Sequence, residues 1–97
     1  MADFPPTHPG EVLRYDFLEP LAVSHYALAE ALGVPEMRIS DLVNGKRAIT
    51  PDTALRLARY FGTSPEFWRG MQQTYDLERT RDRVGAAIEA MVEPRAA

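Results

Sequence analysis

The chain has 97 residues, which is enough for one domain with its own core, and its 45% hydrophobic content is typical of a globular protein. It contains no cysteine, so disulfides, thiolate metal sites and thiol nucleophiles are excluded. No apolar run is long enough to span a membrane, and the N-terminus is neither basic nor apolar enough for a signal peptide. We therefore expect a cytoplasmic protein without a membrane partner.

The N-terminal segment should contain a short tail and one helix. Residues 1–7 include Pro5-Pro6 and are expected to be extended. The run His8-Pro9-Gly10-Glu11 is a helix start, because proline is tolerated in a first turn and an acid is favourable near the positive end of the helix dipole. Apolar residues at 12, 13, 17 and 18 give this helix its buried side, and we expect Pro20 to stop it.

The next segment has the pattern of two helices joined by a tight turn. Ser24 is a suitable N-cap for a helix that ends at Gly33, where the chain needs a left-handed residue. Pro35 suits the first turn of a second helix, which carries apolar residues at 39, 42 and 43 and closes at Asn44-Gly45. The small Ala29 lets the two helices cross closely. This arrangement predicts a helix-turn-helix.

Two further helices follow with the same start signal. Thr50-Pro51-Asp52 should cap a helix that ends at Gly62, and Ser64-Pro65-Glu66 should cap another. Residues 76–83 alternate in charge and predict a solvated helix or a tail, with a further apolar spacing beyond them. With no strand signal, the prediction is an all-α, five-helix domain over residues 8–77, an N-terminal tail over 1–7 and a C-terminal helical extension or tail over 78–97.

The exposed side of the second motif helix is the best candidate for reading DNA. Arg38 could contact guanine through two hydrogen bonds, worth about 1–3 kcal/mol of discrimination, or could instead pair with Asp41. Lys46 and Arg47 follow the helix, where a phosphate would run, although a solvated loop is the alternative. The expected DNA-binding residues are Ser24, His25, Met37, Arg38, Ser40, Asp41, Lys46, Arg47 and Thr50.

Other kinds of site find little support in the sequence. His8 and Glu11 lie one turn apart, but a chain with two histidines and no third convergent ligand is a poor metal protein. No serine or threonine has a recognisable base, so no catalytic residue and no cofactor is expected. A set of apolar residues near the C-terminus should belong to the core or a dimer interface: Phe67, Trp68, Met71, Tyr75, Val84, Ile88 and Met91.

The motif and its flanks resemble a known family. The segment Ser24 to Thr50 is similar to the helix-turn-helix of the lambda-repressor-like (XRE) group, and H-P-G-E-x-L, N-G-K-R-x-I-T-x-D-T-A-L-R-L and F-G-T-S-x-E-F-W resemble HigA-type antitoxins within it. The resemblance covers about residues 8–77. It implies a lambda-repressor-like fold and an antitoxin that neutralises a cognate ribonuclease toxin and, as a dimer, represses its own operon.

The charge distribution qualifies this hypothesis. The net charge is −3 and the sequence pI is 5.3, both unusual for a nucleic-acid-binding protein. The stretch from Ser24 to Arg59 is the only positive block, with five bases and four acids. A monomer should therefore bind DNA weakly, so we expect a homodimer on a palindromic operator of double-stranded DNA. The alternatives are a stand-alone XRE-type regulator or a protein-interaction module that has lost DNA binding; an enzyme is a distant third.

Overall fold

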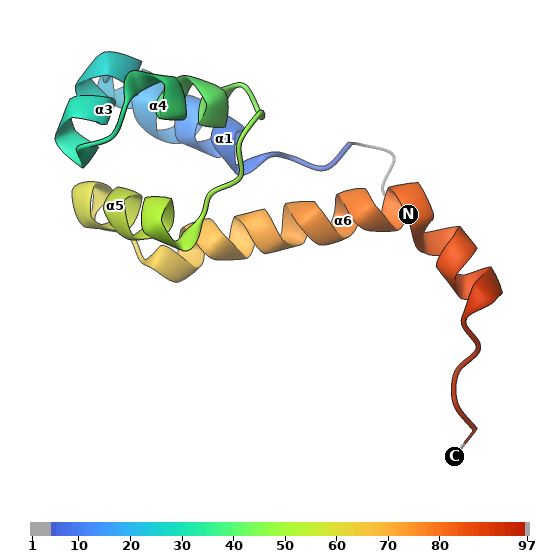
Figure 1. Cartoon of the computed structure of the whole chain (residues 1–97). Coiled ribbons are helices and arrows are strands. Elements are labelled where there is room, and N and C mark those ends of the chain that lie inside the picture. Colours follow the sequence, from blue (N-terminus) through green and yellow to red (C-terminus); the bar gives the residue numbers. More distant parts are fainter. Residues whose placement is uncertain (1–4, 97) are drawn as a thin grey trace.

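The computed structural model describes residues 5–96, in which helices are joined by short connections and no strand occurs, and this confirms the predicted all-α fold class (Figure 1). The helical elements are α1 (Pro9–Val12), η1 (Leu13–Leu18), α2 (Glu19–Leu21), α3 (His25–Leu32), α4 (Glu36–Val43), α5 (Pro51–Phe61) and α6 (Pro65–Met91). Because α1, η1 and α2 follow one another without a break, the domain has five helical segments, as expected. No helix within residues 5–96 is long and apolar enough to cross a membrane.

The first helical segment continues past Pro20, so the expectation that this proline stops the helix is wrong. Proline in an α-helix lacks one hydrogen bond, and its ring collides with the carbonyl four residues earlier. Here η1 has π-helical spacing, in which the Glu19 N–H bonds the carbonyl of Arg14, five residues back. The wider turn makes room for the proline ring. The segment ends instead at Ala22, which adopts the left-handed conformation (φ 55°).

The core is formed by residues from every helical segment. Its buried hydrophobic members are Leu13, Leu18, Leu28, Ala29, Leu32, Ile39, Leu42, Val43, Ile49, Ala54, Leu57, Ala58 and Trp68. The helical periodicity of the sequence correctly placed Ala29, Ile39 and Leu42 inside. Ile49 lies in the connection between α4 and α5 and is also completely buried, so this connection is part of the core rather than a surface loop.

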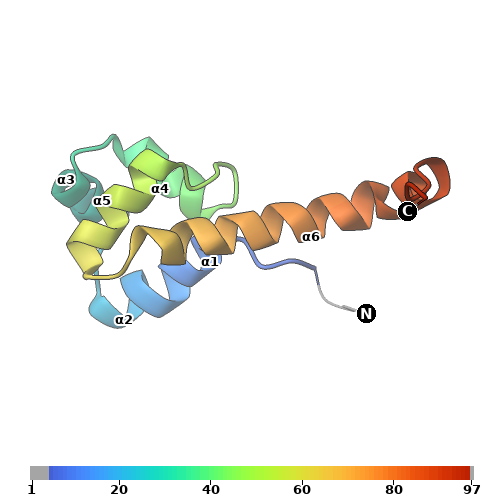
Figure 2. The ribbon, with the colours of Figure 1, turned by 90° about the horizontal axis from the view of Figure 1, so that it is seen from below.

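Helix α6 has two halves with different surroundings. Its buried residues, Trp68 and Gln72, lie in the first half, which packs against the domain. The second half projects away from the other helices, as both views show (Figures 1 and 2), and the molecule measures 53 × 27 × 20 Å. The alternating-charge segment is therefore helical, and the helix ends at Met91, before Pro94.

Candidate nucleic-acid interface

The two helices of the motif are fixed by the local signals seen in the sequence. The Ser24 hydroxyl accepts a hydrogen bond from the Ala27 N–H at 3.0 Å, and Gly33 is left-handed at the end of α3 (φ 71°). Pro35 is the extended residue just before α4, one position earlier than its predicted place in the first turn. At the start of α5, the Thr50 hydroxyl accepts from the Thr53 N–H at 3.3 Å. The helix-turn-helix is therefore formed by α3 and α4.

Helix α4 presents the predicted reading face. Met37 is 66% exposed, whereas Ile39 and Leu42 on the opposite side are completely buried. Ser40 and Asp41 are half-buried at the edge of this face. The His25 ring lies beside this edge, with its Nδ1 3.3 Å from the Ser40 hydroxyl, and so joins the first residue of α3 to α4.

Arg38 is held by a residue that sequence reasoning did not identify. Its Nη1 donates to Asp52 Oδ1 at 3.2 Å, not to Asp41, and its side chain is 28% exposed. The same carboxylate oxygen accepts from Arg56 Nε at 2.8 Å. The Arg56 guanidinium, and to a lesser degree that of Arg38, lowers the pKa of Asp52, which is therefore ionised at neutral pH. No local pattern signals a pair fourteen positions apart.

Lys46 and Arg47 lie in an exposed loop with a defined backbone. Gly45 is left-handed (φ 72°), and the Lys46 N–H bonds the Asp41 carbonyl at 2.8 Å, so the loop turns back on the end of α4. Both basic side chains are exposed, and neither forms an ion pair with another residue in the range 5–96. This geometry is compatible with phosphate contacts by Lys46 and Arg47. It is equally compatible with the alternative, a loop that is only solvated.

This loop is anchored from α6 by two polar side chains that the sequence analysis missed. The buried Gln72 accepts from the Ile49 N–H through its Oε1 at 2.8 Å, and Arg69 donates to the Ile49 carbonyl. Gln72 also donates to Asp76 at 2.9 Å. A buried backbone N–H without a partner would be costly, so these contacts fix the chain between the basic loop and α5. The sequence signal that could have indicated this role of Gln72 is a glutamine one turn after Trp68, within an otherwise apolar stripe of the helix.

The comparisons with known proteins agree with this geometry. Residues 16–68 match the family model described as helix-turn-helix. Virulence-associated protein I of Dichelobacter nodosus is 50% identical over 76 residues, covering 78% of this chain and 70% of that protein. Antitoxin HigA-1 of Vibrio cholerae is 44% identical over 78 residues, covering 80% of this chain and 73% of that protein. The solved Pseudomonas aeruginosa antitoxin HigA, with the higBA promoter, has a TM-score of 0.92 and 43% identity over 94% of this chain and 99% of that one.

The chain belongs to the HigA-type helix-turn-helix family. The resemblance read from the sequence motifs is thereby confirmed. The family is one of DNA-binding regulators and antitoxins rather than a class of enzymes.

In this HigA-type protein, His8 has a structural position. Its Nδ1 accepts from the Gly10 N–H at 2.8 Å and so caps α1, while its ring packs edge-on against Tyr75 with centroids 4.8 Å apart. Burial lowers the pKa of His8 below its ordinary value, although Glu11 opposes the shift. No cluster of potential metal ligands occurs in the described part of the chain.

The residues expected at a dimer interface separate into two groups. Trp68 is completely buried within the monomer, where it packs against Phe17 and donates to the Thr63 hydroxyl at 2.8 Å; of the two predicted alternatives it belongs to the core and not to a dimer interface. Its indole fills the core because α6 crosses the domain at this point. Phe67 is 40% exposed and Met91 is 81% exposed. The other members, Met71, Tyr75, Val84 and Ile88, are partly or largely accessible.

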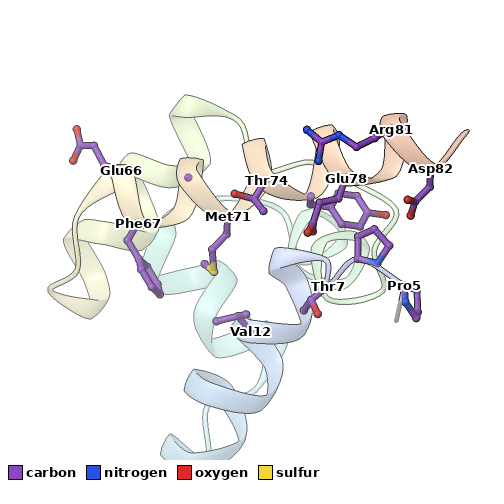
Figure 3. Close-up of a pocket in the computed structure, with 13 residues that line it drawn as sticks. Pro5, Thr7, Val12, Glu66, Phe67, Met71, Thr74, Glu78, Arg81 and Asp82 are labelled. Carbon is purple, nitrogen blue, oxygen red and sulfur yellow. The ribbon is translucent and has the colours of Figure 1, made fainter. Parts of the chain in front are cut away.

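A groove runs beside the first half of α6. It has a volume of about 990 Å³ and lies between the segment 5–7, Val12 and one side of α6. Figure 3 shows Phe67 and Met71 of α6 on the same side as Val12, with Glu78, Arg81 and Asp82 farther along the helix. Phe67, Met71 and Val12 thus line the end next to the domain together with Glu66, whereas Glu78, Arg81 and Asp82 lie with Pro5 at the end toward the projecting half of α6.

Proposed function

We propose that this protein is the antitoxin of a type II toxin–antitoxin pair and represses its own operon by binding an operator in the major groove. The observation that carries the proposal is the exposed face of α4, with Met37 and Arg38 in its first turn and the basic loop after its last turn. The Pseudomonas aeruginosa HigA structure, which has the same fold and contains promoter DNA, supports it. As a transcriptional repressor, the protein would act in the cytoplasm.

The proposed roles follow from where the side chains lie. Met37 is the most exposed residue of the α4 face and can meet a thymine methyl group, whereas the Arg38 guanidinium has donors left for a guanine edge. Ser40 and Asp41 complete the reading edge. Lys46 and Arg47 would contact phosphates, together with His25 and the capped helix ends at Ser24 and Thr50.

Dimerisation is the second part of the proposal. A protein of net charge −3 gains little affinity from its overall charge, so two reading helices are needed to hold one operator. We assign the dimer contact to the apolar side chains along α6 that are at least partly accessible: Phe67, Met71, Tyr75, Val84, Ile88 and Met91. A two-fold dimer would require a palindromic operator with half-sites about 34–36 Å apart, or a multiple of that distance.

Neutralisation of a ribonuclease toxin is the third part, and its main support is the family. Antitoxin HigA-1 of Vibrio cholerae is 44% identical to this chain over 78 residues and is named as an antitoxin. The first helical segment offers an acidic surface with Glu11, Asp16 and Glu19 exposed, which suits a basic partner. Co-purification with the product of the adjacent reading frame tests this part.

Operator binding is tested by fluorescence anisotropy with duplexes from the DNA upstream of the chain's own gene. Lys46→Ala and Arg47→Ala should each lower the slope of log K against log salt by about one unit. Arg38→Ala should cost about 1–3 kcal/mol and relax preference at one base pair. The control is Arg95→Ala, which removes one positive charge from a residue beyond the end of α6. It should change neither the salt slope nor the base-pair preference.

The outcomes separate the alternatives. An unchanged salt slope in the Lys46/Arg47 double variant would remove these residues from the phosphate contacts. Absence of any sequence preference, with the toxin partner still captured, would favour a protein-interaction module that has lost DNA binding.

A further inference from the structure

The carboxylate of Asp52 links α5 to the reading helix α4 and, through Arg56, to the end of α3. Asp52 lies in the first turn of α5, and its Oδ1 accepts from Arg56 Nε at 2.8 Å and from Arg38 Nη1 at 3.2 Å. Arg56 also donates through Nη1 to the carbonyl of Leu32, the last residue of α3, at 2.7 Å. The end of α3, the start of α5 and the reading helix α4 are thereby joined by one chain of charge-assisted hydrogen bonds.

This chain of contacts restricts Arg38 in the free protein. Arginine has a long, flexible side chain, yet here its side chain is only 28% exposed although it leaves the same face as the highly exposed Met37. The contact with Asp52 uses one of the five guanidinium N–H donors, so others remain for a base edge. A side chain ordered before binding loses less conformational freedom on reaching its target.

The position of Asp52 is otherwise unfavourable for a DNA-binding protein. It lies two residues after Thr50, a proposed phosphate contact, and a carboxylate there would repel the DNA backbone. An acid in the first turn of α5 interacts favourably with the helix dipole, but an exposed ion pair adds little to folding, so the contact of Asp52 with Arg38 contributes little to stability. An acid that weakens general affinity but orients a reading arginine increases selectivity instead.

We propose that Asp52 is a positioning residue that sets the Arg38 guanidinium for base readout, an inference that rests on the proposed role of Arg38. Arg56 completes the arrangement by fixing Asp52 to the end of α3. Asp52 thus determines specificity without contacting a base. Its removal should reduce the preference for the operator and leave binding to unrelated DNA as tight or tighter.

The test is a double-mutant cycle on specificity. Binding of Asp52→Asn, Arg38→Ala and the double variant is measured by anisotropy on the upstream operator duplex, on versions of it with single base-pair changes, and on an unrelated duplex of equal length. Asp52→Asn should lower the ratio of operator to unrelated affinity about 2- to 10-fold. The loss should fall on the same base pair that Arg38→Ala affects, and the double variant should behave as Arg38→Ala alone.

Controls exclude a general effect on the fold. Glu66→Gln removes an acid from the equivalent position of α6, after the same Ser/Thr-Pro start, and should leave the ratio unchanged. Asp52→Ser, which also suits a helix start, should reproduce Asp52→Asn, whereas Asp52→Glu should restore part of the preference. Thermal melts establish that each variant is folded.

Three results would overturn the inference. If the specificity ratio is normal in Asp52→Asn but reduced in Arg38→Ala, Asp52 does not position Arg38, whereas the proposed function remains supported. An additional loss of specificity when Asp52→Asn is added to Arg38→Ala shows that Asp52 acts independently of Arg38. An Arg38→Ala variant with normal base preference refutes the reading role of Arg38 itself, and the inference with it.

Discussion

Replacement of Gly10 by alanine tests how closely α1 and α4 are packed. A Cβ at this position would lie 1.8 Å from the carbonyl oxygen of Leu42 and 2.7 Å from its carbon. Ordinary C···O contacts begin near 3.3 Å, so the two helices would have to separate by about 1.5 Å. The obstructing atoms belong to the backbone of α4, and no side-chain rotation can relieve them.

The expected loss of stability follows from two opposing terms. Overpacking a rigid site costs about 1–3 kcal/mol or more, and replacement of a helical glycine by alanine returns about 0.5–1 kcal/mol. Because the clash here involves backbone, we expect a net destabilisation of about 2 kcal/mol. In a domain of this size, such a loss lowers the melting temperature by about 8–16 °C.

The assay is urea denaturation followed by circular dichroism, with Gly70→Ala as the matched control. Gly70 lies within α6, and a Cβ added there would meet no neighbouring group within 4 Å, so alanine should stabilise the protein by about 0.5–1 kcal/mol. A Gly10→Ala variant that is as stable as the parent, or that gains as much as Gly70→Ala, would refute the close packing of α1 on α4.

Two further predictions concern His8 and the end of α6. Because burial lowers the pKa of His8, the unfolded chain binds a proton at this histidine more readily than the folded chain does. The contribution of neutral His8 to the free energy of unfolding should therefore be complete above about pH 6.5 and decline as the pH falls below it. In thermal melts across this range, His8→Asn, which keeps a capping acceptor, should show a weaker decline, and an identical decline would contradict the assignment. Truncation after Leu77 should weaken dimerisation and leave the five-helix domain folded, because Trp68 and Gln72 are retained. Sedimentation over a dilution series measures this, and undiminished dimer affinity would exclude the second half of α6 from the contact.

Local signals explain why much of the fold could be predicted. Ser24, Thr50 and Ser64 each cap a helix through an N–H three residues ahead, and Gly33 and Gly62 end helices in the left-handed conformation. These interactions depend only on neighbours in the chain. The rule for Pro20 was also local but failed, because the π-helical turn of η1 relieves the clash on which the rule is based.

The candidate site was predictable only in part, for a related reason. Helical periodicity places Met37 and Arg38 on the outer face of α4, but it suggested Asp41 as the partner of Arg38 instead of Asp52. The contact between Gln72 and Ile49 spans twenty-three positions. Such pairs arise from the packing of whole helices, which no short sequence window contains.

The continuity of α6 gives the proposed dimer a mechanical property. The same helix holds Ile49, next to the basic loop, through Gln72 and continues to Met91, with a bend in its projecting half (Figure 1). A single residue inserted after Leu77 would rotate the far half by about 100° and advance it by about 1.5 Å. In the proposed dimer, this rotation would change the orientation of one α4 reading helix relative to the other about the DNA axis. In the proposed dimer, the length of α6 would therefore set the spacing of the half-sites without any change in the domain that reads the bases.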